Sequence, residues 1–241
     1  MKKYLLFIFI TSVYIESFAQ NNGQDSILRS IALTKAINFY TSQIDIQRGL
    51  NNGLEYDSYL PNIKGSPNFN NESGWNKGDV IYNGIKYKNI PLKYDLVKDL
   101  VVVLDTNTNL PFTLINDKVC EFWLLDHHFI FLKGGNDKLN VNGFYDLLSN
   151  GNIIFYVKRT KGIRTLSSTF SIEKEFHERL FYLIEKENTR RFITSKSDFL
   201  ALFKEKKSII KGYLKANKID YNVNQELYMK KAIIYYETLN K

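Results

Sequence analysis

The sequence contains a single cysteine, so an internal disulfide is excluded and the fold must be held together by packing. Cys120 lies in the segment KVCEFWLL among apolar neighbours, which predicts a buried and unreactive thiol. Proline is scarce, aromatic residues are plentiful, and neither an internal repeat nor a low-complexity tract is present. This composition is typical of an ordinary globular protein of one or two domains.

Apolar runs long enough to cross a bilayer are also missing, since a membrane helix needs roughly 20 apolar residues. The run from Tyr4 to Ile15 is shorter, follows Lys2 and Lys3, and precedes a small-x-small cleavage site at Ser17-Phe18-Ala19. These features are typical of a secretory signal peptide. We therefore expect export to the periplasm or beyond the cell, cleavage after Ala19, no lipid anchor, and no transmembrane segment in the mature chain.

Sequence motifs of common enzymes are absent as well. The chain has no G-x-S-x-G, P-loop, G-x-G-x-x-G or H-E-x-x-H. On a strand, His127 and His128 point to opposite faces, which leaves an Asp126-x-His128 pair without a third ligand. His177 has no motif around it. We predict no metal site, no cofactor and no catalytic residue, and we favour a non-catalytic role.

The segment VVVLDTNTN, residues 101–109, permits three interpretations. A protease loop needs Gly two residues after Asp105, where Asn107 stands, and a second copy of the motif is missing. A calcium loop would use Asp105, Asn107 and Asn109, but its sixth and twelfth positions hold Leu110 and Asn116 instead of Gly and Glu. We favour a hairpin turn, because Asp and Asn bond their own backbone and tolerate positive φ.

Hydrophobic periodicity predicts an α+β protein: an N-terminal helix, a central antiparallel β-meander rolled into a sandwich or partly open barrel, and basic C-terminal helices. The first helix is expected in QDSILRSIALTKAINFYTSQI, with Asp25 or Ser26 as its cap. Asn83-Gly84 and Asn150-Gly151 each predict a type I′ hairpin turn. The expected divisions are a signal peptide, a helix with a long loop, a β-rich core and helices packed on it: 1–19, 20–78, 79–195 and 196–241.

Charge is distributed unevenly along the mature chain. Residues 20–157 contain 12 basic and 14 acidic side chains, whereas residues 158–241 contain 19 basic and 10 acidic ones. In the helix expected over DFLALFKEKKSIIKGYLKANK, Ser197 or Asp198 would be the cap and one face would be apolar. The other face carries the candidate binding residues, all lysines at helical spacing: Lys204, Lys207, Lys211, Lys215 and Lys218.

Three stretches, KGDVIYNGIKYKNIPLKYDLVKDLVVV, NGFYDLLSNGNIIFYVKRTK and LFKEKKSIIKGYLKANKI, resemble a group of exported proteins of Bacteroidota. The resemblance covers most of the mature chain and includes the Y-D-L-x-x-D turn and the G-F-Y-D-x-L hairpin. The group has no assigned activity, so the resemblance implies export and a shared fold and transfers no catalytic residue. The 105–109 loop lies outside the stretches that carry it.

The function expected from these observations is binding or scaffolding at the cell envelope. The lysine face would meet an anionic envelope component, such as lipid A or an acidic polysaccharide, or an acidic protein. Nucleic acid is not an expected partner of an exported chain. Two alternatives stay open: a carrier of a small apolar ligand inside the meander, or a hydrolase using unfamiliar titratable residues, namely Asp95, Asp99, Asp105 and His128.

Overall fold

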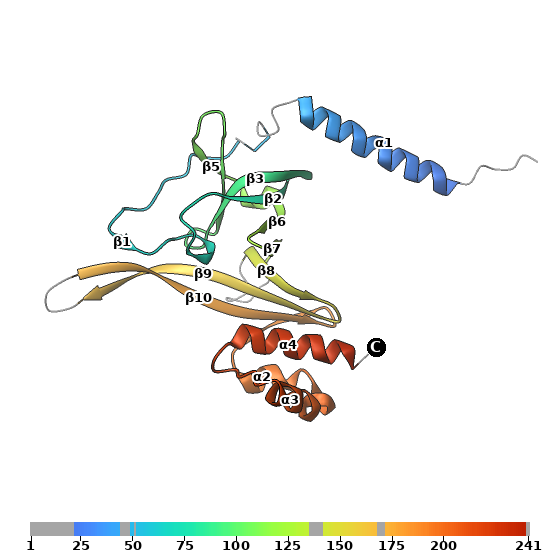
Figure 1. Cartoon of the computed structure of the whole chain (residues 1–241), viewed down its shortest axis with the longest axis vertical. Helices are drawn as coiled ribbons and strands as arrows, with labels where there is room; N and C mark the ends of the chain where they lie inside the picture. The colour runs from blue at the N-terminus through green and yellow to red at the C-terminus, as the bar shows by residue number, and fades with distance from the viewer. Residues whose placement is uncertain (1–21, 44–48, 51, 135–141, 168–171, 240–241) are drawn as a thin grey trace, which may run out of the picture. The chain divides into compact units, whose positions relative to one another are not determined.

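The computed structural model describes residues 22–43, 49–50, 52–134, 142–167 and 172–239, and the chain divides into two compact units, residues 1–46 and 47–241. The first unit contains helix α1, Asn22–Gln43, which confirms the expected helix (Figure 1). It begins before Asp25 and Ser26, so neither residue is its cap. Cleavage after Ala19 concerns residues that lie outside the described part.

The second unit is built on one large open sheet of eleven strands. Neighbouring strands follow the order β1-β10-β9-β8-β7-β6-β2-β3-β4-β5, and β11 pairs with β10. The strand bounds are β1 Ile63–Lys64, β2 Asn76–Tyr82, β3 Ile85–Asp95, β4 Leu100–Leu104, β5 Pro111–Thr113, β6 Val119–Leu124, β7 His127–Leu132, β8 Gly143–Asn150, β9 Ile153–Ser167, β10 Ile172–Lys186 and β11 Thr189–Ile193.

The α+β class is confirmed, and the sheet is mixed rather than wholly antiparallel. The two-residue strand β1 runs parallel to β10, while the other paired strands in the described part of the chain are antiparallel. The parallel pair was missed because Ile63–Lys64 lies in the Asn- and Gly-rich loop, where no strand pattern is visible. The sheet curls, since the N–H of Lys161 on β9 donates to the carbonyl of Leu96 after β3 at 2.9 Å.

Two of the expected hairpins differ in how they turn. Asn83 and Gly84 both have positive φ, 52° and 79°, between β2 and β3, which confirms the type I′ prediction. Asn150 and Gly151 join β8 and β9 as expected, but neither is among the residues with positive φ. That turn is held instead from the C-terminal helix, where the Glu237 carboxylate accepts from the amide of Asn152 and from the backbone N–H that follows.

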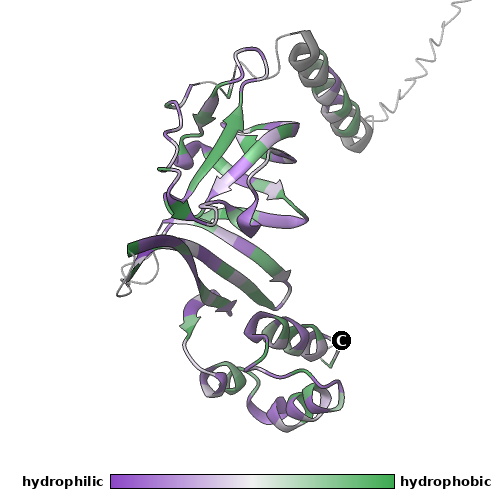
Figure 2. Cartoon of the chain, turned by 60° about the vertical axis from the view of Figure 1, so that its left-hand side comes forward, coloured by the Kyte–Doolittle hydropathy of each residue, from purple (hydrophilic) through white to green (hydrophobic). Residues whose placement is uncertain are grey.

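The expected basic helix is broken into three pieces. They are α2 Lys196–Ala201, a 3-10 turn η3 Lys204–Lys206, and α3 Lys207–Ala216, followed by α4 Gln225–Thr238. The cap of α2 is Ser195, whose Oγ accepts from the N–H of Asp198 at 3.1 Å; the predicted caps Ser197 and Asp198 lie inside the helix. Polar and apolar residues alternate along these helices (Figure 2), as expected for helices with one buried side.

Two main cores fill the second unit. The curled sheet encloses aromatic side chains, including Tyr94, Phe122, Phe129 and Phe144, each fully buried. The rings of Phe122 and Phe129 stack with centroids 4.7 Å apart. The second core joins one face of β9 and β10 to α2, α3 and α4. The inside of the meander is therefore packed with side chains, which gives no support to an apolar ligand there.

Buried tyrosines should make the free energy of unfolding fall as the pH rises into the alkaline range. Burial raises the pKa values of Tyr145, Tyr156 and Tyr182 to about 12, from 10.0. The unfolded chain loses these protons first, so their contribution is complete below pH 10 and is lost between pH 10 and about 12. Each lowers the free energy of unfolding by up to about 1.4 kcal/mol per pH unit in that window.

We expect urea unfolding at increasing pH to show the midpoint falling steeply above pH 10, together with the rise of tyrosinate absorbance. Replacing Tyr156 by Phe removes one titrating group and should make the fall shallower. A midpoint that stays constant from neutral pH through this window would contradict the prediction.

Candidate functional site

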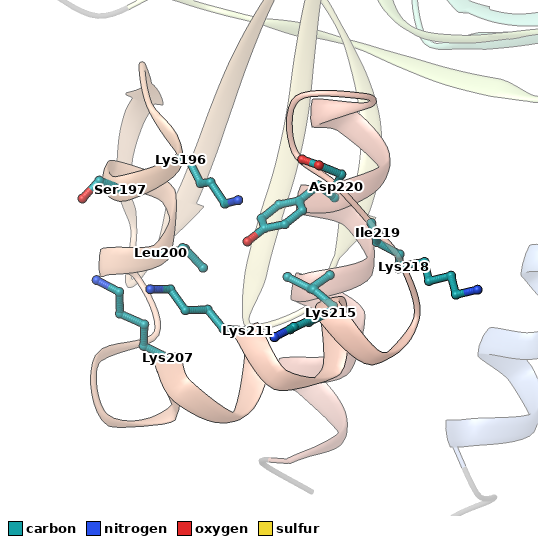
Figure 3. A pocket seen from close by; sticks show the side chains of 11 residues that line it. Lys196, Ser197, Leu200, Lys207, Lys211, Lys215, Lys218, Ile219 and Asp220 are labelled. Carbon is teal, nitrogen blue, oxygen red and sulfur yellow. The ribbon is translucent and has the colours of Figure 1, made fainter.

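A cleft lined by lysines lies between α2, α3 and the segment that leads into α4 (Figure 3). Its volume is about 770 Å³, within the range of sites that hold a small molecule or a few linked units. We call it the lysine cleft. It is lined by Lys196, Ser197, Leu200, Lys207, Lys211, Leu214, Lys215, Lys218, Ile219, Asp220 and Tyr228.

The break in the expected helix creates this cleft. The chain turns after α2, so the start of α2 and the length of α3 face each other instead of forming one rod. Ile210 and Leu214 bury the apolar side of α3. Lys207, Lys211 and Lys215 follow one another at intervals of four residues, which places them on one side of the helix.

The cleft is strongly cationic because its lysines lack acidic partners. Among the described residues, no carboxylate forms a salt bridge with Lys196, Lys207, Lys211, Lys215 or Lys218. The Lys196 ammonium lies 5.1 Å from the ring centroid of Tyr228. Burial raises the pKa of Tyr228, and nearby Asp220 raises it further. Tyr228 is therefore a neutral hydroxyl at physiological pH.

Sequence reasoning identified four of these lysines and missed one. Lys207, Lys211, Lys215 and Lys218 line the cleft, whereas Lys204 does not. Lys204 stands in η3 with a φ of 44°, where the helical periodicity has stopped. Lys196 was missed because α2 and α3 were treated as a single helix; the S-x-x-D spacing from Ser195, typical of a helix start, was the available signal.

The chain was compared with protein-family models, with curated proteins and with solved structures. No match was found in any of the three. The site must therefore be interpreted from its own residues.

Asp95 and Asp99, proposed above for a hydrolase, flank the same turn but have separate partners. Asp95 is fully buried and accepts from the hydroxyls of Tyr56 at 2.9 Å and Tyr59 at 3.0 Å. Its other oxygen accepts the backbone N–H groups of residues 97 and 98. Burial raises the pKa values of both tyrosines, and Asp95 adds to the shift. The tyrosine contacts fix the long loop to the sheet, and the backbone contacts close the turn after β3.

Asp99 belongs to a partly buried ion pair. Lys158 Nζ donates to Asp99 Oδ2 at 2.6 Å, and the hydroxyl of Tyr94 donates to Asp99 Oδ1 at 2.6 Å. Burial lowers the pKa of Lys158 and outweighs the attraction of Asp99. Gly143, at φ 150°, passes so close that a Cβ there would clash with both charged groups. The pair thus needs glycine at this position, and it joins the β3–β4 turn to β9.

A second buried cluster lies nearby on β9. Arg159 donates to Asp146 Oδ2 from two nitrogens at 2.8 and 2.6 Å, and also to Glu226 of α4 at 3.1 Å. His127 Nδ1 lies 2.7 Å from the same Asp146 oxygen. An Asp–His pair therefore exists, with His127 rather than the expected His128. Because Glu226 belongs to α4, the cluster ties the helices to the sheet.

Asp105 closes the β4–β5 hairpin, as the favoured interpretation predicted. Its Oδ1 accepts the N–H of Asn107 at 2.9 Å, and its Oδ2 accepts the hydroxyl of Thr108 at 2.9 Å. These bonds, the first above all, lower the pKa of Asp105. Asn109 has a φ of 58°, and the backbone N–H of Asp105 donates to the carbonyl of Leu110. Both carboxylate oxygens are thus occupied by the turn itself.

His128 lies on the outer face of the meander. Its Nε2 is 2.6 Å from Glu121 Oε2, and its ring stacks on Trp123 with centroids 4.5 Å apart. Asp126 sits in the β6–β7 turn at a φ of 62°, not on the strand. Within the described ranges, no three potential metal-binding His, Cys, Asp or Glu side chains come together.

Cys120 is exposed, so the prediction of a buried thiol was wrong. Val119 and Phe122 of β6 are buried, whereas Cys120 is exposed at the point where the pairing of β6 with β2 shifts register. Apolar neighbours in sequence did not determine burial, because adjacent strand residues face opposite sides. Separately, none of the helices in the described part of the chain combines the length and apolar character that a membrane span requires.

Proposed function

We propose that this protein is an exported, non-catalytic binding protein of the cell envelope whose lysine cleft holds an anionic ligand. The observation that carries the proposal is a cavity of about 770 Å³ lined by five lysines without carboxylate partners in the described structure. Lysines that only solvate a helix project singly into water, whereas these five line one concave surface. A concave cationic surface favours an anion over a neutral solute.

The residue type fits a carboxylate, sulfate or phosphate ligand. Lysine presents a compact charge on a flexible stem and does not demand the planar, two-pronged geometry that arginine prefers. Each lysine near an anionic surface contributes about 1 kcal/mol, so several acting together give specific binding at moderate ionic strength. The excess of basic residues over acidic ones after residue 158 supports basic C-terminal helices as the binding part.

The expected location limits which anionic molecules the protein would meet. The sequence predicts export, and the cell envelope is rich in acidic glycans and anionic lipids that an exported basic protein meets first. The charged side chains Asp95, Asp99 and Asp146 are used in contacts that hold the fold together, which supports a binding role rather than a catalytic one.

The proposal predicts that removing the cleft charges weakens binding to an acidic polymer at least tenfold. The test variant replaces Lys196, Lys207, Lys211 and Lys215 by Gln, and binding of the mature protein to polygalacturonate is measured by calorimetry. A matched control replaces four exposed lysines on or beside the sheet by Gln, with the same loss of charge: Lys77, Lys88, Lys118 and Lys174.

The control variant should keep its affinity within about threefold, since exposed distant charges are screened at 0.1 M salt over ~10 Å. Equal losses of affinity in the two variants would mean that binding depends only on net charge, and the cleft would then have no special role. The same probe at high salt should bind the wild type far more weakly. Circular dichroism of both variants checks that the fold is retained.

A further inference from the structure

Four of the five lysines of the cleft form a line, and the fifth, Lys196, lies on α2. Lys207, Lys211 and Lys215 are four residues apart along α3, and Lys218 follows directly after the helix. With a rise of 1.5 Å per residue, successive lysines are about 6 Å apart and the row spans about 16 Å. Figure 3 shows the four side chains in sequence along one edge of the cleft.

The two ends of this row are electrostatically different. The Lys207 end coincides with the start of α3, where the helix dipole favours an anion. The Lys218 end carries Asp220, the single carboxylate among the lining residues. In Figure 3 the Lys218 ammonium also points away from Lys211 and Lys215. An anion is therefore attracted most strongly by the first half of α3 and least by the end next to Asp220.

The floor of the cleft is apolar. Half-buried Ile219 and the methylene stems of the lysines form its accessible apolar surface, above Leu200, Leu214 and Tyr228, which are only 2, 1 and 3 % exposed. A chain of sugar rings presents carbon-bound hydrogens on its faces and acid groups at its edges. Such a chain can pack its ring faces on this floor while its acid groups meet the lysines. A chain of bare phosphates offers the charges but no apolar face.

We infer, on the basis of the proposed function, that the ligand is a linear acidic polysaccharide lying along α3, with its strongest charge contacts at Lys207 and Lys211. A linear chain with one acid group on each sugar meets the lysines in succession. A compact anion of equal charge reaches only part of the row. Affinity should therefore depend on the length of the anion and not only on its charge.

The first test measures binding of galacturonate oligomers of increasing length, with inositol hexakisphosphate as a compact anion and phosphatidylglycerol vesicles as a lipid surface. Affinity is expected to rise with each added sugar until the row is filled, and then to level off. The oligomer that fills the row should bind at least tenfold more tightly than the compact anion. Binding of the compact anion or the vesicles alone would overturn this inference and leave the anion-binding function standing.

The second test compares single variants of equal charge change. K207Q and K211Q should each weaken binding of the longer oligomers about three- to tenfold, K218Q should weaken it less than either, and K204Q should change it less than twofold. Lys204 is a matched control because it lies on the same segment outside the cleft. Equal losses in all four variants would contradict the assigned polarity. No binding of any probe would overturn both this inference and the proposed function.

Discussion

Replacing Asp146 by Ala should lower the free energy of unfolding by about 3–5 kcal/mol, because it leaves the Arg159 guanidinium buried beside a single remaining carboxylate. Asp146 is 1 % exposed and Arg159 is 8 % exposed, so water cannot replace the lost partner. Two nitrogens of Arg159 donate to the same Asp146 oxygen, and His127 Nδ1 lies 2.7 Å from it. The removed carboxylate thus serves three contacts at once.

Two further variants test whether the loss of stability comes from the unpaired buried charge or from the lost side-chain volume. Glu226→Gln should lower the free energy of unfolding clearly less than Asp146→Ala does. The Glu226 side chain is 25 % exposed, and the amide oxygen of Gln still accepts a hydrogen bond. The double variant Asp146→Ala with Arg159→Met removes both charges and should recover part of the loss. Urea unfolding measures all of them. A double variant less stable than Asp146→Ala alone would show that the unpaired charge is not the cause.

Replacing Phe129 by Ala should lower the free energy of unfolding by a similar amount, about 3–5 kcal/mol, by opening a cavity in the aromatic core. Phe129 is fully buried and its ring stacks on Phe122. The rings of Phe69 and Tyr94 meet it edge-on at 5.1 and 5.0 Å. Three rings from separate parts of the chain therefore lose contacts together.

Phe181→Ala provides the matched control, since Phe181 on β10 is 37 % exposed. This substitution should lower the free energy of unfolding by less than about 1 kcal/mol. Urea unfolding of the two variants should show a lower midpoint for Phe129→Ala with an unchanged slope. Similar midpoints for the two variants would mean that the stacked rings contribute no more than an exposed ring.

Local signals predicted the local structure of this chain. Asn83-Gly84 turns with positive φ because the type I′ hairpin requires it, and Asp105 closes its own hairpin through hydrogen bonds within five residues. Asn150-Gly151 carries the same dipeptide signal and turns differently, since Glu237, more than eighty residues away, holds that turn. A short motif cannot predict a contact with a residue so distant in the sequence.

The buried charges of β9 show the same limit. Lys158, Arg159 and Lys161 are buried, although basic residues are mostly exposed in folded proteins. Their partners lie on other elements: Asp99 is 59 residues away and Glu226 is 67 residues away. Lys161 donates to the carbonyls of residues 66 and 68 in the long loop. The curl of the sheet brings Asp99 and the long loop to β9, and the packing of α4 on the sheet brings Glu226 there.

The sequence predicted part of the candidate site. Helical spacing was sufficient to place Lys207, Lys211 and Lys215 on one side of α3, because that rule depends only on residues within one helix. The interruption between α2 and α3 was not predicted, and it removes Lys204 from the row and brings Lys196 into the cleft. The concave shape arises from packing between helices, which periodicity does not report.

The most direct test of the central claim is lysine acetylation of the mature protein, measured by mass spectrometry with and without polygalacturonate. We predict that the polymer protects Lys196, Lys207, Lys211 and Lys215, while Lys88 and Lys174 on the sheet react at unchanged rates. Protection should disappear at high salt, since exposed charges are screened there. Equal protection of all exposed lysines, or protection confined to the sheet, would contradict the lysine cleft as the binding site.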